Sequence, residues 1–184
     1  MLEPWFQLEP AQWNDLENHY QLLCRWNKVL NLTRIDRSED AALRHYGESL
    51  FLARHLPEGD LRIADIGSGG GFPGFPVAIA RPDCSIKLIE SHQRISVFLR
   101  EATRGLRNVR VLAQRAEDVR APVDWVISRA VSYSDLSRSL GVLASRVALL
   151  TGVEVPPDPL GFSWEPAIPL PWGKQRFLRL GRRH

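Results

Sequence analysis

The chain has 184 residues, of which 44% are hydrophobic and 24% are charged, with a formal net charge of +3. This composition excludes a disordered or fibrous chain and fits one domain of ordinary size. The longest apolar runs are too short to cross a membrane, and the acidic, proline-containing start does not look like a signal peptide. Two distant cysteines, Cys24 and Cys84, exclude a disulfide framework and a zinc site. We therefore expect a soluble cytoplasmic protein without a metal.

The first sixty residues predict two helices. In the first, one helical stripe contains Leu16, Tyr20, Leu23, Asn27 and Leu30. A second helix is expected to start after an N-cap at Ser38 and to stop before Pro57. We expect residues 1–60 to form a helical extension that packs on a core of residues 61–184, so that the whole chain is one compact unit.

From residue 61 onwards, strand patterns and helix patterns alternate. Short apolar runs predict strands at 61–66, 85–89, 109–112, 123–127 and 146–150, with a last edge strand at 177–180. Helical patterns lie at 73–80, 95–106 and 136–143. This alternation predicts an α/β fold of the Rossmann-like type, a mostly parallel sheet with helices on both faces. Ligands of such sheets bind beyond the carboxyl ends of the strands, so the residues there are the candidates for a site.

A glycine-rich segment follows the first predicted strand and reads DIGSGGGFPG over residues 65–74. Glycine lets the backbone turn sharply and approach a ligand, and the amides at the next helix start can donate hydrogen bonds. Gly69, Gly71 and Gly74 also satisfy the G-x-G-x-x-G spacing of dinucleotide-binding folds, which keeps NAD as a candidate. Asp65 favours S-adenosylmethionine instead, because its carboxylate suits the ligand's ammonium and would repel a pyrophosphate.

The later strand ends add three candidate positions. Glu90 can accept hydrogen bonds from the ribose hydroxyls of either cofactor. The residues after the third strand, Arg115 to Asp118, are placed to meet an adenine edge. The segment Ser128-Arg129-Ala130 ends the fourth strand and would face the transferred methyl group. Arg129 could alternatively be a brace that pairs with Glu117 or Asp124.

Arginine dominates the basic residues, since Lys28, Lys87 and Lys174 are the only lysines among 24 basic side chains. Arginine binds phosphate and stacks on bases better than lysine does, and the basic balance favours a polyanionic partner. The codon usage of a GC-rich genome would give the same bias.

Five stretches, in order along the chain, resemble a known family. They read YQLLCRWNKVLNLT over residues 20–33, RHYGESL over 44–50, DIGSGGGFPG over 65–74, RAE over 115–117 and SRA over 128–130. Together they are similar to the bacterial glucose-inhibited division protein B family, the 16S ribosomal RNA guanine-N7 methyltransferases. The resemblance implies a class I S-adenosylmethionine-dependent methyltransferase fold, and as partner 16S ribosomal RNA or the small ribosomal subunit. We expect a monomer.

The resemblance also implies roles for individual residues. The residues it places around S-adenosylmethionine, and its product S-adenosylhomocysteine, are Gly67, Ser68, Gly69, Phe72, Glu90, Ala116 and Glu117. We add Asp65, Gly71 and Arg129 to that set from the strand-end argument. Arg129 and, by position, Arg176 are implied to contact the substrate. We expect Arg94, which stands where the family usually has lysine, to join them in RNA binding on the same face as the cofactor mouth.

Three positions depart from the family. Glu48 replaces the usual aspartate, Thr151 stands where the family tends to have lysine, and the proline-rich segment 153–171 is short. Thr151 and the short segment favour a second interpretation, in which the chain is a family member that binds the cofactor but has lost or changed its RNA substrate. A nucleotide-dependent oxidoreductase is a third reading, although the chain has no second substrate domain. Guanine N7 is already nucleophilic, so methyl transfer to it requires positioning and not a general base.

Overall fold

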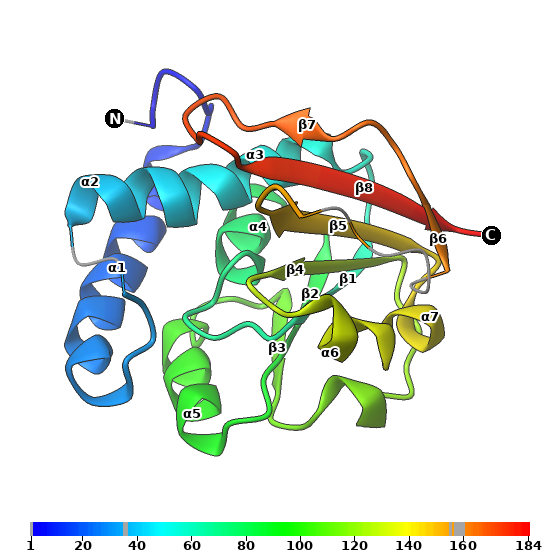
Figure 1. Cartoon of the computed structure of the whole chain (residues 1–184). Coiled ribbons are helices and arrows are strands. Elements are labelled where there is room, and N and C mark those ends of the chain that lie inside the picture. Colours follow the sequence, from blue (N-terminus) through cyan, green and yellow to red (C-terminus); the bar gives the residue numbers. More distant parts are fainter. Residues whose placement is uncertain (1, 35–36, 155, 157–160) are drawn as a thin grey trace.

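The computed structural model describes residues 2–34, 37–154, 156 and 161–184. Its centre is a single sheet of eight strands in the order β3-β2-β1-β4-β5-β8-β6, with β7 paired to β8 (Figure 1). The parallel part comprises β1 (Arg62–Ile66), β2 (Ser85–Ile89), β3 (Val109–Leu112), β4 (Trp125–Arg129) and β5 (Arg146–Thr151). The antiparallel part comprises β6 (Phe162–Trp164), β7 (Ile168–Pro169) and β8 (Phe177–Arg183). The strands β2 and β3 lie on one side of β1, and β4 and β5 lie on its other side, so the strand order changes direction between β1 and β4.

Helices cover both faces of this sheet, which confirms the predicted fold class. One buried cluster packs the sheet against α1 (Pro10–Leu30), α3 (Glu48–His55), α4 (Gly74–Ala80) and α5 (Gln93–Ala102). The second cluster packs it against α6 (Tyr133–Ser137) and α7 (Leu140–Leu143), beside the 3-10 helix η2 (Ala116–Asp118). Alternate residues of one strand serve the two clusters, because side chains in a strand point to opposite faces. Ile63 joins the first cluster and Ala64 the second.

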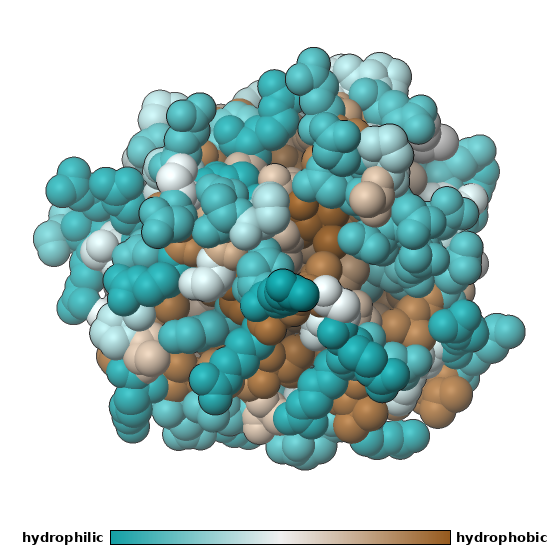
Figure 2. Space-filling model, turned by 180° about the vertical axis from the view of Figure 1, so that it is seen from behind, coloured by the Kyte–Doolittle hydropathy of each residue, from teal (hydrophilic) through white to brown (hydrophobic). Residues whose placement is uncertain are grey.

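The N-terminal helices share a core with the sheet. Leu16 and Leu23 of α1 and Leu50 of α3 belong to the same buried cluster as Leu88 and Ile127 of the strands. Between α1 and α3 lie α2 (Ser38–Ala41) and the π-helix η1 (Ala42–Gly47), which continue directly into α3. A π-helix widens the helical turn and occurs often at functional sites. The described residues include no helix long and apolar enough to span a membrane. Figure 2 shows one face covered largely by hydrophilic side chains, with hydrophobic surface between them.

Three local predictions differ from the structure. The strand at the C-terminus is not an edge strand, because β8 lies between β5 and β6, and the segment before it folds back to pair with it. Ser38 is the first helical residue and Arg37 occupies the N-cap, without a side-chain hydrogen bond. The predicted helix over 136–143 is two short helices, and the first starts earlier, at a Ser132 cap whose hydroxyl accepts from the Asp135 amide.

Gly74, at the start of α4, allows the glycine-rich segment to lie directly on the sheet. A Cβ at this position would lie 2.3 Å from Leu88 Cδ2 and 2.6 Å from Asp65 Oδ2. We therefore expect Gly74→Ala to lower the free energy of unfolding by roughly 1–3 kcal/mol, the usual cost of overpacking. Urea unfolding of the variant and of the wild type measures this loss. The control is Gly105→Ala, where nothing lies within 4 Å of the new Cβ, and an equal loss in both variants would contradict the packing argument.

Candidate active site

The turn between β1 and α4 depends on glycine at defined positions. Gly67, Gly69 and Gly71 have φ of +70°, +50° and +89°, in the left-handed region that side chains disfavour. At Gly67 a Cβ would also lie 2.5 Å from Val131 Cγ2. The amides of Gly67 and Ser68 donate to the Ile89 carbonyl at 2.9 and 3.2 Å, which ties the turn to the end of β2.

Glu90 follows β2 and holds the turn from the other side. Its carboxylate is buried, with Oε2 accepting from the Gly69 amide at 3.1 Å and Oε1 from the His92 amide at 2.8 Å. Oε1 also lies 3.2 Å from Nδ1 of the exposed His92 ring. A carboxylate has about four lone pairs, so Oε2 can still accept another hydrogen bond, and Oε1 can do so when the His92 ring turns away. Glu90 lines a cavity of about 600 Å³, together with Gly67, Ala116 and Glu117. Four residues of the predicted cofactor set therefore meet at one cavity.

Other residues around this cavity were missed by the sequence prediction. They are Ser91, His92, Gln114, Ser132, Asp135 and Arg138, among others. Ser91 and Gln114 come soon after strands, so the strand-end rule could have found them. Asp135 and Arg138 come from α6 and the residue after it, where no sequence pattern marked a site.

Asp65, by contrast, lies beneath the turn and does not line the cavity. It is completely buried; Oδ2 accepts from the Gly74 amide at 3.0 Å, and Oδ1 has no hydrogen-bond partner among the described residues. Burial raises the pKa of its carboxyl to about 7. Ser68 is buried too, and its hydroxyl donates to the Asp65 carbonyl at 3.0 Å. The contact between Asp65 and a ligand ammonium stays a prediction, and the unpartnered Oδ1 is an acceptor for it.

Phe72 also packs inward. Its ring stacks on His45 of η1, with 4.4 Å between the ring centroids and 13° between the ring planes. His45 is itself buried, and Nε2 lies 2.7 Å from the Thr33 hydroxyl. Burial, with the charge of Arg129 nearby, lowers the pKa of His45 to about 3, so this imidazole is neutral at physiological pH. Gly69 and Gly71 likewise shape the turn and are not among the residues around the cavity.

A second cavity, of about 300 Å³, adjoins the first. Both are lined by Ala130, Val131 and Ser132, the segment that follows β4. Ala130 has a φ of +60°, an uncommon conformation for a residue with a side chain. The second cavity is also lined by Arg129 and Arg176, so the structure brings together these two predicted substrate residues, from the end of β4 and the segment before β8.

One buried glutamate holds both arginines. Glu48 accepts from Arg176 Nε at 3.0 Å and from Nη2 at 2.7 Å, and Arg129 Nε lies 3.4 Å from its Oε2. Arg129 Nη1 also contacts Nδ1 of His45. The predicted pairing of Arg129 with Glu117 or Asp124 is wrong, because Asp124 pairs with Arg62 at 2.7 Å and Glu117 with Arg115 at 3.8 Å. The role of Glu48 gave no signal in the sequence beyond its place in the RHYGESL stretch.

Arg94 does not join this cluster. It lies in the first turn of α5 as an exposed residue and lines neither cavity. Helix α5 follows β2, so Arg94 is on the same edge of the sheet as Arg129. Its contact with substrate stays a prediction.

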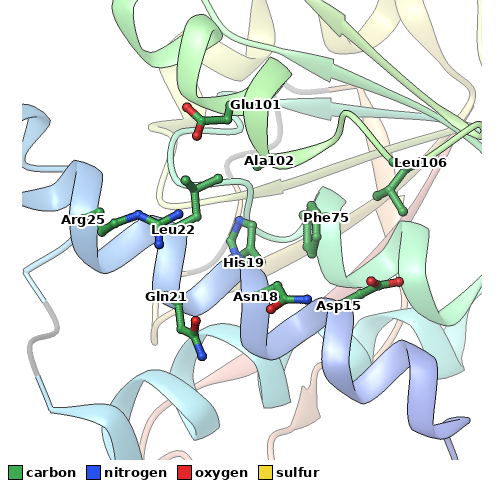
Figure 3. Close-up of a pocket in the computed structure, with 11 residues that line it drawn as sticks. Asp15, Asn18, His19, Gln21, Leu22, Arg25, Phe75, Glu101, Ala102 and Leu106 are labelled. Carbon is green, nitrogen blue, oxygen red and sulfur yellow. The ribbon is translucent and has the colours of Figure 1, made fainter.

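A third cavity, of about 410 Å³, lies between α1 and α5 (Figure 3). Its lining includes Asp15, Arg25 and Glu101, and the buried imidazole of His19, whose pKa is lowered to about 3 by burial. None of the predicted site residues lines it. Within the described part of the chain no group of three His, Cys, Asp or Glu side chains could hold a metal ion. The candidate active site is therefore the pair of adjoining cavities at the carboxyl edge of the sheet.

Comparisons with known proteins point to one family. The GidB family model, described as rRNA small subunit methyltransferase G, matches residues 12–141. "Ribosomal RNA small subunit methyltransferase G" of Dichelobacter nodosus is 47% identical over 121 residues, which cover 64% of this chain and 57% of that relative. The protein of the same name from Nitrosospira multiformis is 41% identical over 136 residues, covering 71% of this chain and 62% of the relative. The chain thus spans about three fifths of the length of these relatives.

Solved structures support the fold. A SAM-dependent methyltransferase from Aquifex aeolicus superposes with a TM-score of 0.65 at 15% identity, over 82% of this chain and 96% of that one. Magnesium protoporphyrin IX methyltransferase from Synechocystis, solved with bound SAH, gives a TM-score of 0.66 at 13% identity, over 88% and 93% of the two chains. At these identities the likeness shows the Rossmann-like methyltransferase fold and no more.

The raised pKa of Asp65 predicts a pH-dependent stability. Its carboxyl titrates near pH 7 in the folded chain and near 3.8 when unfolded, so the folded state binds the extra proton between these values. This contribution stabilises the folded state at low pH and is lost as the pH rises from about 4 to about 7. The lowered pKa values of His19 and His45 make the folded state more stable as the pH rises through much of this window. The contribution of Asp65 is therefore measured as the difference in stability between the wild type and a variant that lacks this carboxyl.

We expect Asp65→Asn to gain stability relative to the wild type as the pH is raised from 4 to 7. Urea unfolding of both proteins at half-unit steps of pH measures this difference. Asp124→Asn serves as a control that should differ from the wild type by a nearly constant amount over this range, because the Arg62 hydrogen bond lowers the pKa of Asp124 and its carboxyl is ionised in both states above pH 4. A constant difference between wild type and Asp65→Asn across this range would contradict the raised pKa.

Proposed function

The chain belongs to the GidB family, and we propose that it transfers a methyl group from S-adenosylmethionine to N7 of a guanine in 16S ribosomal RNA, guanine 527 in the family. The proposed site of action is the cytoplasm, on the RNA or on the small ribosomal subunit. The observation that carries the proposal is the pair of adjoining cavities, one lined by the cofactor candidates and one by Arg129 and Arg176.

The larger cavity fits the cofactor. Its volume of about 600 Å³ lies within the usual range for small-molecule sites. Glu90 would accept hydrogen bonds from the two ribose hydroxyls, one at Oε2 and one at Oε1 in place of the exposed His92 ring. Ala116 and Glu117 would meet the adenine, and Gly67 leaves the backbone accessible. The unpartnered Oδ1 of Asp65 would take the ammonium if the turn opens toward it. S-adenosylmethionine, when bound, supplies an electrophilic methyl group on a sulfonium.

The smaller cavity fits a base that needs positioning only. Arg176 uses Nε and Nη2 on Glu48, and Arg129 uses Nη1 on His45, so each arginine keeps one terminal nitrogen for a ligand. Arginine cannot lose its charge at neutral pH, so it is a poor base and a good hydrogen-bond donor to guanine O6. N7, which is next to O6, would then face the cofactor cavity along the segment from Ala130 to Ser132. Holding two reactants in line is a large part of the barrier reduction in such a step.

Methylation mapping tests the proposed activity. N7-methylguanine in 16S ribosomal RNA is mapped in cells with and without the gene, and in RNA treated with the purified protein. Loss of one modified guanine in the deletion strain and its return with the purified chain is the expected result. Cofactor binding without any change in 16S ribosomal RNA would favour the relative with a changed substrate. Binding of NAD in place of S-adenosylmethionine in calorimetry would favour the oxidoreductase.

Glu90→Ala tests the cofactor cavity. We expect this change to weaken binding of S-adenosylmethionine, because hydrogen bonds to a charged group contribute roughly 1.5–3 kcal/mol each. Loss of one such bond corresponds to about a tenfold to hundredfold increase in Kd, measured by calorimetry. Glu58→Ala, at an exposed glutamate, is the matched control and should bind as the wild type does. Equal affinities of Glu90→Ala and Glu58→Ala for the cofactor would show that Glu90 does not bind the ribose.

Arg129→Ala tests the base cavity. We expect nearly unchanged cofactor affinity and a large loss of methyl transfer, on the order of a hundredfold, because a base displaced by about 1 Å reacts poorly. Arg129→Lys should recover little, since an ammonium lacks the planar two-point contact. Single-turnover methylation, cofactor binding and Tm are measured on one preparation. If Tm and cofactor affinity fall in proportion to the rate, Arg129 only holds the strand ends together.

A further inference from the structure

Arg179 in β8 is a buried arginine that the active site described so far does not use. It pairs with Leu149 across the sheet and is only 9% exposed. Its Nε donates to the Thr151 hydroxyl at 3.1 Å and its Nη2 to the Val153 carbonyl at 3.4 Å. The guanidinium carbon lies 5.5 Å from the centre of the Phe177 ring. All of these partners are neutral.

No carboxylate of the described residues lies within ion-pair distance of this guanidinium. The two arginines that line the neighbouring cavity, Arg129 and Arg176, by contrast share the carboxylate of Glu48. Burying a charge is costly unless it is paired, and a folded chain usually supplies the counter-charge itself. A buried arginine that is held in place by neutral oxygens has its charge available for an anionic ligand.

The position of Arg179 connects this charge to the substrate cavity. Thr151 and Val153, its two hydrogen-bond partners, both line the cavity of about 300 Å³ that contains Arg129 and Arg176. Tyr133, which also lines it, has its pKa raised by burial, and the charge of Arg179 acts against that rise. Arg129 and Arg176 thus line the cavity and Arg179 lies behind its wall at Thr151 and Val153, against the buried Glu48 and the exposed Glu154.

We infer that Arg179 and the Thr151 hydroxyl form a phosphate subsite beside the base cavity, which binds the RNA backbone next to the target guanine. The inference rests on the proposed function and names the part of the substrate that this wall contacts. A phosphate oxygen accepts charge-assisted hydrogen bonds from a guanidinium. The Thr151 hydroxyl, which accepts from Arg179 and donates to the Gly152 carbonyl at 3.2 Å, would turn from that carbonyl to donate to the phosphate. In this arrangement β8 supplies the positive charge that the sequence lacks at position 151, so Thr151 does not signify a lost RNA substrate.

Arg179→Gln removes the charge and keeps a hydrogen-bonding side chain. We expect weaker binding to a 16S ribosomal RNA transcript, and a slope of log K against log salt that is smaller by about 0.7–0.9, the value for one phosphate contact. Cofactor affinity should not change. The matched control is Arg182→Gln, the same charge change on the same strand, at an exposed position that pairs with Arg146 at the opposite end of β5. This control should keep the slope of the wild type.

Two variants at Thr151 separate a binding role from a structural one. Thr151→Lys in the Arg179→Gln background restores a cation at the same wall, so it should recover most of the affinity and of the salt slope. Thr151→Glu in the otherwise unchanged chain gives Arg179 an internal partner. It should leave Tm equal or higher while reducing RNA affinity and the slope, and it tests the subsite even if Arg179→Gln does not fold.

Three outcomes of these measurements would each overturn a different claim. If Arg179→Gln and Thr151→Glu bind RNA with the affinity and salt slope of Arg182→Gln, the phosphate subsite does not exist. If Arg179→Gln lowers Tm and Thr151→Lys restores neither affinity nor slope, Arg179 is a structural brace of β8. If the wild type itself neither methylates 16S ribosomal RNA nor binds it in a salt-dependent way, the proposed function fails, whatever the variants do.

Discussion

The buried carboxylate of Glu48 is the interaction on which the proposed substrate side of the molecule depends. It is 1% exposed and joins three distant parts of the chain, the helix that begins at Glu48, the end of β4 through Arg129, and the segment before β8 through Arg176. Breaking a buried ion pair by removing one partner costs roughly 3–5 kcal/mol, because a charge is left uncompensated. The cavity lined by the two arginines is therefore complete only when all three parts are folded together. The N-terminal helices accordingly belong to the site as well as to the core.

His45 links that cluster to the cofactor turn. On one side its ring stacks on Phe72, and on another its Nδ1 contacts Arg129. The lowered pKa keeps the imidazole neutral, so Nδ1 can accept a hydrogen bond from the guanidinium, which a protonated ring could not do. The π-helix η1 carries His45 and ends next to Glu48, and it brings both side chains to Arg129.

The two cavities are lined by different side chains. The larger one has several polar and charged groups around it, among them Glu90, Gln114, Asp135 and Arg138. The polar side chains around the smaller one are Ser128, Arg129, Ser132, Tyr133, Thr151, Glu154 and Arg176. Among the described residues, those that line both cavities are Ala130, Val131 and Ser132, none of which is a base at neutral pH. This suits a reaction that needs two reactants in line and no base. Asp65, whose pKa is raised, stays beneath the turn.

The sequence alone determined the alternation of strands and helices, because buried parallel strands and amphipathic helices have distinct periods of hydrophobicity. It also located Gly67, Glu90, Ala116 and Glu117 at one cavity, since the carboxyl ends of parallel strands meet at one edge. Only the tertiary structure decided that Arg94 stays outside the cluster, that β8 lies inside the sheet, and that Glu48 rather than Glu117 or Asp124 pairs with Arg129. It also placed Arg179 against Thr151, which are 28 residues apart. Such pairings depend on strand register and on which side chains are excluded from water together, and neither is encoded in the spacing of residues along the chain.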